Sequence, residues 1–123
     1  MMHRRHFLGT SLLAGLATQA FGATKEEDSF DFAFLTDIHV QPELGAPEGF
    51  RQCLRAVNAL GTPADFVLTG GDLIFDALDV GMDRIREQWK VFDECSKELA
   101  LPVHHTIGNH DVVGWSTKSP VKP

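Results

Sequence analysis

Short apolar runs alternate with longer amphipathic segments along most of the chain. The apolar runs at 30–36, 65–69 and 103–107 have the length and composition of buried strands. The segments at 48–60 and 82–99 carry apolar residues at helical spacing, with charged and polar residues on the opposite face. The pattern therefore predicts the element order β-α-β-α-β.

Strands joined through helices of this length pair in parallel, with right-handed crossovers. The expected fold class is thus α/β with a parallel sheet. Four residues that favour turns predict a loop between the first strand and the first helix: Pro42, Gly45, Pro47 and Gly49. In parallel sheets of this kind, ligands bind beyond the carboxyl ends of the strands.

A polar cluster follows each of the three predicted strands. The members are Asp37 and His39, then Asp72, then Asn109, His110 and Asp111. Because the carboxyl ends of parallel strands meet at one edge of the sheet, we expect the three clusters to form a single site. Gly71 and Gly108 directly precede the second and third clusters, where they allow close backbone approaches that a Cβ atom would prevent.

Carboxylate, imidazole and amide groups together suit divalent cations such as Mn, Fe or Zn. A single Asp or Asn at a strand end more often makes a turn or caps a helix. Delivery from three consecutive strands favours a metal site over three unrelated turns. His104 and His105 lie within the third predicted strand, so we expect one to face the core and the other to pack against a helix.

These clusters resemble the first three sequence blocks of the calcineurin-like metallophosphoesterases. The resemblance covers about residues 31–114 and rests on Asp37-x-His39, Gly71-Asp72 and Gly108-Asn109-His110-Asp111. It implies that the β-α-β-α-β unit is part of the four-layer αββα fold of that family. It also implies a hydrolase that acts on phosphate mono- or diesters.

The resemblance further implies a centre of two divalent metal ions, Mn, Fe or Zn. Asp37 and His39 would bind the first ion, Asp72 would bridge both, and Asn109 would bind the second. Two such ions lower the pKa of a bridging water and so supply a hydroxide that attacks the phosphorus.

The resemblance assigns catalytic roles to the last two residues of the third cluster. His110 would lie beside the phosphate, where it would stabilise the transition state or protonate the leaving oxygen. Asp111 would orient His110 by accepting the second ring N–H.

The family pattern continues with a further His and a Gly-His-x-His block, and no histidine follows His110 in this sequence. We therefore expect residues 30–123 to be the N-terminal part of a truncated phosphoesterase domain, with an incomplete metal site and little activity alone. The alternative is an exported, non-catalytic module that binds metal or phosphate. A redox or nucleotide-binding α/β protein lacks support, because the chain has no Gly-x-Gly-x-x-Gly or Gly-x-x-x-x-Gly-Lys loop.

The overall charge excludes one class of partner. The net charge of the 123-residue chain is −6, so it lacks the basic surface that neutralises nucleic-acid phosphates. A phosphate-ester substrate would have to be attracted locally by bound cations.

The N-terminal residues resemble a twin-arginine export signal. Arg4 and Arg5 precede Phe7 and Leu8, and a mildly apolar stretch too short to span a bilayer follows. We expect a signal peptide at 1–22, an acidic tether at 23–29, and a periplasmic or secreted mature chain without a transmembrane anchor. The alternative for residues 1–22 is an ordinary amphipathic helix.

Two cysteines, Cys53 and Cys95, lie on different predicted helices. Export would allow them to form a disulfide, but only if their Cα atoms were close. We expect both to be small buried residues.

Overall fold

The computed structural model describes residues 29–116 and 118–121. The expected signal peptide, and the expected acidic tether except Ser29, lie outside these residues. In chain order the elements are β1 (Phe32–Leu35), α1 (Ala46–Asn58), β2 (Phe66–Thr69), α2 (Met82–Ser96), β3 (Val103–His104) and the 3₁₀ helix η1 (Asn109–Asp111). The predicted order is confirmed, and each strand is shorter than its apolar run.

The three described strands form one parallel sheet in the order β1-β2-β3. In β1 and β2, Phe32 pairs with Phe66 and Leu35 pairs with Thr69, while β3 joins β2 through Val67 and Val103. All carboxyl ends therefore point to the same edge, as the sequence predicts. The fold is α/β, consistent with part of the metallophosphoesterase fold.

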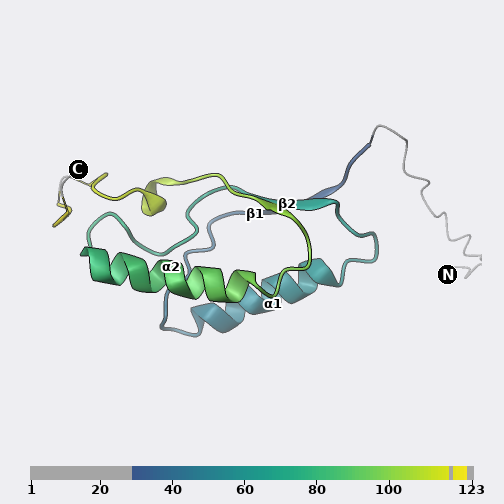
Figure 1. Ribbon diagram of the computed structural model, residues 1–123, viewed down its shortest axis with the longest axis horizontal. Helices are drawn as coiled ribbons and strands as arrows, with labels where there is room; N and C mark the ends of the chain where they lie inside the picture. Colours follow the sequence, from purple (N-terminus) through teal and green to yellow (C-terminus); the bar gives the residue numbers. More distant parts are fainter. Residues whose placement is uncertain (1–28, 117, 122–123) are drawn as a thin grey trace, which may run out of the picture.

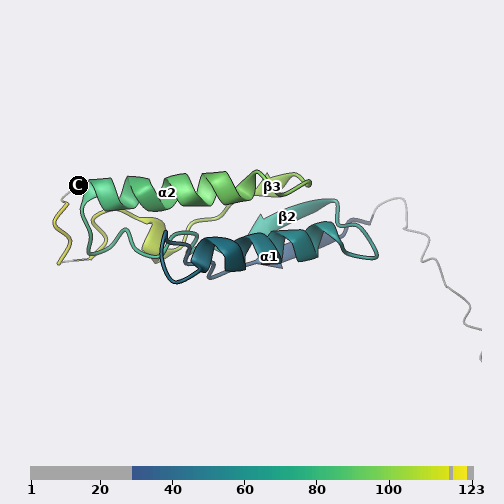
Figure 2. The same ribbon diagram turned by 90° about the horizontal axis from the view of Figure 1, so that it is seen from below.

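Both helices lie on the same side of the sheet (Figure 1). Seen from that side, α1 and α2 run side by side, roughly along the direction of the strands (Figure 2). Their shared contact includes a stacked pair of rings, Phe50 of α1 and Phe92 of α2, with centroids 5.5 Å apart. No described helix is both long enough and apolar enough to cross a bilayer.

The core lies between this helix pair and the sheet with its following loops. Its buried residues are Val40, Phe50, Leu54, Leu73, Ile74, Ala77, Ile85, Phe92 and Cys95. Three of these, Leu73, Ile74 and Ala77, belong to the loop after β2 rather than to a strand. The loop that carries Asp72 is therefore anchored in the core.

The start of α1 differs from the prediction. The helix begins at Ala46 rather than at Glu48, so Pro47 occupies its first turn. Proline suits the first turn because the N–H groups there have no helical acceptor. The expectation for Cys53 is also wrong, since it is exposed on α1 whereas Cys95 is buried. Cys53 lies at the edge of the apolar face of α1, next to the buried Leu54.

Candidate metal centre

The loops after β1 and β2 continue side by side beyond the sheet. The backbone N–H of Asp37 donates to the Gly71 carbonyl at 3.2 Å, and that of His39 donates to the Asp72 carbonyl at 2.9 Å. A parallel bridge between Val40 and Ile74 closes the pair. These bonds hold the first and second polar clusters in register.

Three candidate site residues have unusual backbone conformations. Asp37, His39 and Asp72 have φ angles of 54°, 47° and 52°, the left-handed region that residues with a Cβ rarely enter. Such conformations cost about 1–3 kcal/mol each and tend to occur at functional sites. The paired loops and the buried residues that follow them keep these strained residues in place.

Glycines allow the second and third clusters to approach. Gly71 has a φ of 92°, and a Cβ on it would overlap the backbone of Gly108. A Cβ on Gly108 would in turn overlap the carboxylate and backbone of Asp72. The predicted reason for Gly71 and Gly108 is therefore confirmed by the geometry.

His39, Asp72 and His110 converge at this edge. One ligand atom of each lies within 4.8 Å of the others. The Nε2 atom of His39 is 3.7 Å from Oδ2 of Asp72 and 3.9 Å from Oδ1 of Asp37. Asp72 is mostly shielded, with 17% of its side chain exposed, whereas Asp37 has 66% exposed.

Asp72 and His110 are also joined directly. The Oδ1 atom of Asp72 accepts the backbone N–H of His110 at 3.0 Å, which leaves Oδ2 turned toward His39. The two histidine rings meet edge to face, with centroids 4.7 Å apart. One carboxylate thus connects all three clusters.

The tautomer of His110 follows from its contact with a backbone carbonyl. Its Nδ1 atom lies 2.6 Å from the carbonyl oxygen of Phe75. A carbonyl can only accept, so Nδ1 carries the proton and a neutral ring has its lone pair on Nε2. This arrangement is typical of histidines that bind metals, whose second ring nitrogen donates to a carbonyl or carboxylate.

The expected role of Asp111 in orienting His110 is replaced by a different one. The Oδ1 atom of Asp111 accepts the N–H groups of Leu73 and Ile74 at 2.8 and 3.1 Å, and Oδ2 accepts that of Gly108 at 2.8 Å. Both oxygens therefore bind backbone, and the Phe75 carbonyl holds the His110 ring instead. The spacing of the third cluster could not reveal this, because the acceptor for His110 is a main-chain atom of another loop.

The family model for calcineurin-like phosphoesterases matches residues 30–122. The chain belongs to the calcineurin-like phosphoesterase family. None of the curated proteins matches it. For a calcineurin-like phosphoesterase, the expected activity is that of a phosphoesterase hydrolase, and the family typically binds metals.

The residues that converge in this calcineurin-like phosphoesterase suit a divalent cation. Distances of 3.7 and 3.9 Å from His39 to the two carboxylates are too long for hydrogen bonds. Two ligand atoms on opposite sides of one cation lie ~4.2 Å apart when each bond is about 2.1 Å, so these shorter distances allow both atoms to bind the same cation. The Nδ1 atom of His39 is buried and has no hydrogen-bond partner among the described residues. No direct hydrogen bond therefore joins the His39 imidazole to the carboxylates of Asp37 and Asp72.

The other sequence candidates lie around this group. Asn109 is exposed at the start of η1, and only its backbone carbonyl has a described partner, the N–H of Val112. His105 packs against Phe92 of α2 and contacts the Thr69 hydroxyl, and His104 packs on Phe66. Both lie away from the cluster. One of the two packs against a helix as expected, but both are exposed, so the expectation that one would face the core is wrong.

One supporting residue was missed by the sequence analysis. Gln88 is fully buried on α2; its Oε1 accepts the N–H of Asp76, and its Nε2 donates to the Asp76 carbonyl. Asp76 in turn accepts the N–H groups of Leu78 and Asp79. Gln88 thus fixes the loop that carries the Phe75 carbonyl. A polar residue between Ile85 and Phe92 on the buried face of α2 is the signal that could have found it.

Proposed function

We propose that this chain is an exported, metal-dependent phosphoesterase that hydrolyses phosphate mono- or diesters. The single observation that carries the proposal is the convergence of His39, Asp72 and His110 within 4.8 Å at the carboxyl edge of the sheet. The family supports the reaction class. The expected signal at residues 1–22 is the basis for proposing export to the periplasm or secretion.

Four side chains would hold two divalent cations, Mn, Fe or Zn. Asp37 and His39 are proposed for the first, Asp72 for a position between both, and Asn109 for the second. When bound, the cations would supply Lewis-acid activation of water and would neutralise charge on the phosphoryl group. The chain's own contribution is to hold these oxygen and nitrogen atoms in fixed positions through the paired loops.

His110 is proposed as the residue beside the phosphate. With Nδ1–H held by the Phe75 carbonyl, its Nε2 is the atom that accepts or donates a proton. A protonated Nε2 can donate to a phosphoryl oxygen or to the leaving oxygen. Asp111 supports this role only indirectly, because it fixes the backbone on both sides of the site.

The proposal is tested with the full chain, Mn(II) and bis-p-nitrophenyl phosphate. Because the metal site is expected to be incomplete, we expect slow metal-dependent release of nitrophenolate, which Asp72→Asn abolishes. Metal affinity should fall by more than the ~10- to 100-fold that loss of an outer partner costs. Asp79→Asn is the matched control, since Asp79 lies exposed in the same loop.

Two outcomes would contradict the proposal. Turnover that is the same in Asp72→Asn and in the unchanged chain would place the reaction elsewhere. Saturable metal binding without turnover of either a monoester or a diester would instead favour the non-catalytic metal- or phosphate-binding module. Isothermal titration with Mn(II) separates these two results.

A further inference from the structure

The loop after β2 holds His110 at three points. The Nδ1 atom of His110 lies 2.6 Å from the Phe75 carbonyl oxygen, its backbone N–H donates to Asp72, and its carbonyl accepts the N–H of Ala77 at 2.8 Å. Only the first of these contacts involves the ring. The direction of the Phe75 carbonyl therefore decides how the ring is oriented and which ring nitrogen carries the proton.

The Phe75 carbonyl belongs to a peptide group whose other end is bound by α2. The N–H of Asp76 is part of the same peptide and donates to Oε1 of Gln88 at 2.9 Å. A trans peptide is planar, with its N–H and C=O pointing in opposite directions, so a fixed N–H also fixes the C=O. A hydrogen-bond relay thus runs from the Gln88 amide through the Phe75–Asp76 peptide to the His110 ring.

The Gln88 amide cannot turn away from this peptide without losing its other bonds. Its side chain is fully buried, and Nε2 donates to the carbonyls of Asp76 and Arg84 at 2.8 and 3.3 Å. The acceptor oxygen and both amide hydrogens are therefore used, and an inverted amide would set its NH₂ group against the N–H of Asp76. Away from water, such linked hydrogen bonds also polarise and strengthen one another.

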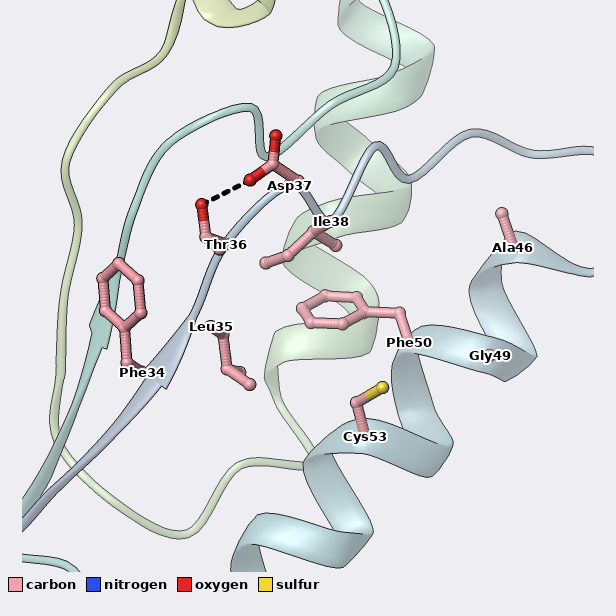
Figure 3. Close-up of a pocket in the computed structure, with 9 residues that line it drawn as sticks. All are labelled: Phe34, Leu35, Thr36, Asp37, Ile38, Ala46, Gly49, Phe50 and Cys53. Carbon is pink, nitrogen blue, oxygen red and sulfur yellow. Dashed lines mark hydrogen bonds between the residues drawn. The ribbon is translucent and has the colours of Figure 1, made fainter.

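Uncharged groups hold other residues of the site as well. The Thr36 hydroxyl donates to Oδ2 of Asp37 at 2.7 Å (Figure 3), and a backbone N–H binds Oδ1 of Asp72. The relay to His110 follows the same pattern. It places a neutral amide, acting through a peptide, where the sequence led us to expect a carboxylate.

We infer that Gln88 is a positioning residue that sets the tautomer of His110 through the Phe75–Asp76 peptide. Gln88 does not touch the reacting groups. Its amide keeps the Phe75 carbonyl directed at Nδ1, so the proton stays on Nδ1 and Nε2 is free to accept or donate one. The value of this tautomer for phosphate-ester hydrolysis rests on the proposed function, whereas the relay itself does not.

The tautomer of His110 in the full chain, with metal removed by EDTA, tests the relay. Long-range ¹H–¹⁵N spectra at about pH 9, where an ordinary histidine ring is neutral, distinguish a proton on Nδ1 from one on Nε2. We expect the Nδ1–H form in the unchanged chain. Gln88→Met keeps the length of the side chain but removes its acceptor and donor, so the ratio of the two forms should shift toward Nε2–H by ~2- to 10-fold, the range that one hydrogen bond contributes.

Three further variants separate positioning from stability. Gln88→Glu keeps an oxygen that can accept the Asp76 N–H, so it should restore the Nδ1–H form. Gln88→Asn keeps a polar amide that ends one carbon short of the peptide, so it should shift the ratio as Gln88→Met does and replaces that variant if it fails to fold. Ile85→Val trims the same buried face of α2 and should lower the unfolding temperature without changing the tautomer.

Three results would overturn the inference. The first is a proton on Nε2 of His110 in the unchanged chain. The second is an unchanged ratio in Gln88→Met or Gln88→Asn while the ring signals of His104 and His105 show that the fold is intact. The third is an equal shift in Ile85→Val, which would show that the tautomer follows stability alone. No step uses metal or substrate, so failure here leaves the proposed phosphoesterase activity standing, and failure of the nitrophenolate assay leaves the relay standing.

Discussion

At the scale of single residues, the site depends on carboxylates that have different tasks. Asp72 has one oxygen on a backbone N–H and the other facing His39. Asp111 uses both of its oxygens to accept backbone N–H groups from two loops. Asp72 is therefore positioned to bind a ligand, whereas Asp111 holds the two loops together.

Replacing Asp111 should reduce stability more than it changes the chemistry of His110. Asp111→Ala leaves three partly buried N–H groups without an acceptor, and we expect a loss of about 2–4 kcal/mol in the free energy of unfolding. Asp111→Asn keeps one acceptor oxygen and should lose less. Urea denaturation measures both. A normal stability for Asp111→Ala would contradict the role assigned to its carboxylate.

The chemical character of the site residues could be predicted from the sequence, and their contacts could not. Strand-end placement brought Asp37, His39, Asp72 and His110 to one edge, as parallel pairing requires. The partner of His110 is the Phe75 carbonyl, and every residue has a carbonyl, so no residue type marks it in the sequence. The exposure of Cys53 depends on the rotation of α1, which the apolar stripe defines only to within one neighbouring position.

At the scale of elements, the site depends on how closely the strand-end loops approach. At Gly71, a φ of 92° and the close contact with the Gly108 backbone both exclude a side chain. Pattern analysis located the strands and helices because their periodicity is strong. The predicted helix starts too late, at Glu48, because Pro47 favours a turn in isolation although it is compatible with a first helical turn.

Gly71→Ala should therefore separate the second and third clusters. The strain and the overlap with Gly108 should cost about 1–3 kcal/mol and weaken Mn(II) binding. Gly81→Ala is the matched control, because a Cβ at Gly81 meets open space. Thermal unfolding and metal titration of the two variants give the comparison. Equal behaviour of both would show that the close approach is not required.

An ion pair joins the loop before α1 to the start of α2. Glu43 binds Arg84, and this hydrogen bond lowers the pKa of the Glu43 carboxyl below its ordinary value of 4.5. A lowered folded-state pKa means that the stabilisation is present above pH 4.5 and is lost as the pH falls through the folded value. Acid should thus loosen the contact between this loop and α2.

Glu43→Gln should flatten that part of the pH dependence. The free energy of unfolding at neutral pH should fall slightly. As the pH is lowered below 5, the further loss of stability should be smaller in Glu43→Gln than in the unchanged chain. Asp93→Asn, on the exposed face of α2, serves as the control. Chemical denaturation at a series of pH values provides the data. An unchanged acid limb in Glu43→Gln would rule out this pair as its source.

At the scale of the whole molecule, both described helices lie on one face of the sheet, and no described helix covers the other (Figure 1). The core between sheet and helices is continuous with the loops that carry the site, through Leu73, Ile74 and Ala77. The bare face presents Phe32 and Phe34 to solvent. The apolar run at 30–36 predicts a buried strand, but a run of apolar residues does not show which of its faces the helices cover.

We propose that His39 is a ligand of the metal centre with His110 next to it, and that His104 and His105 lie away from it. Titration of the full chain with Zn(II), followed by long-range ¹H–¹⁵N spectra of the histidine rings, tests this directly. We predict that the ring signals of His39 and His110 shift together and saturably, with Nδ1 of His110 remaining protonated, and that Asp72→Asn abolishes the shifts. Absence of a saturable shift at these two rings, or equal shifts at His104 and His105, would contradict the account.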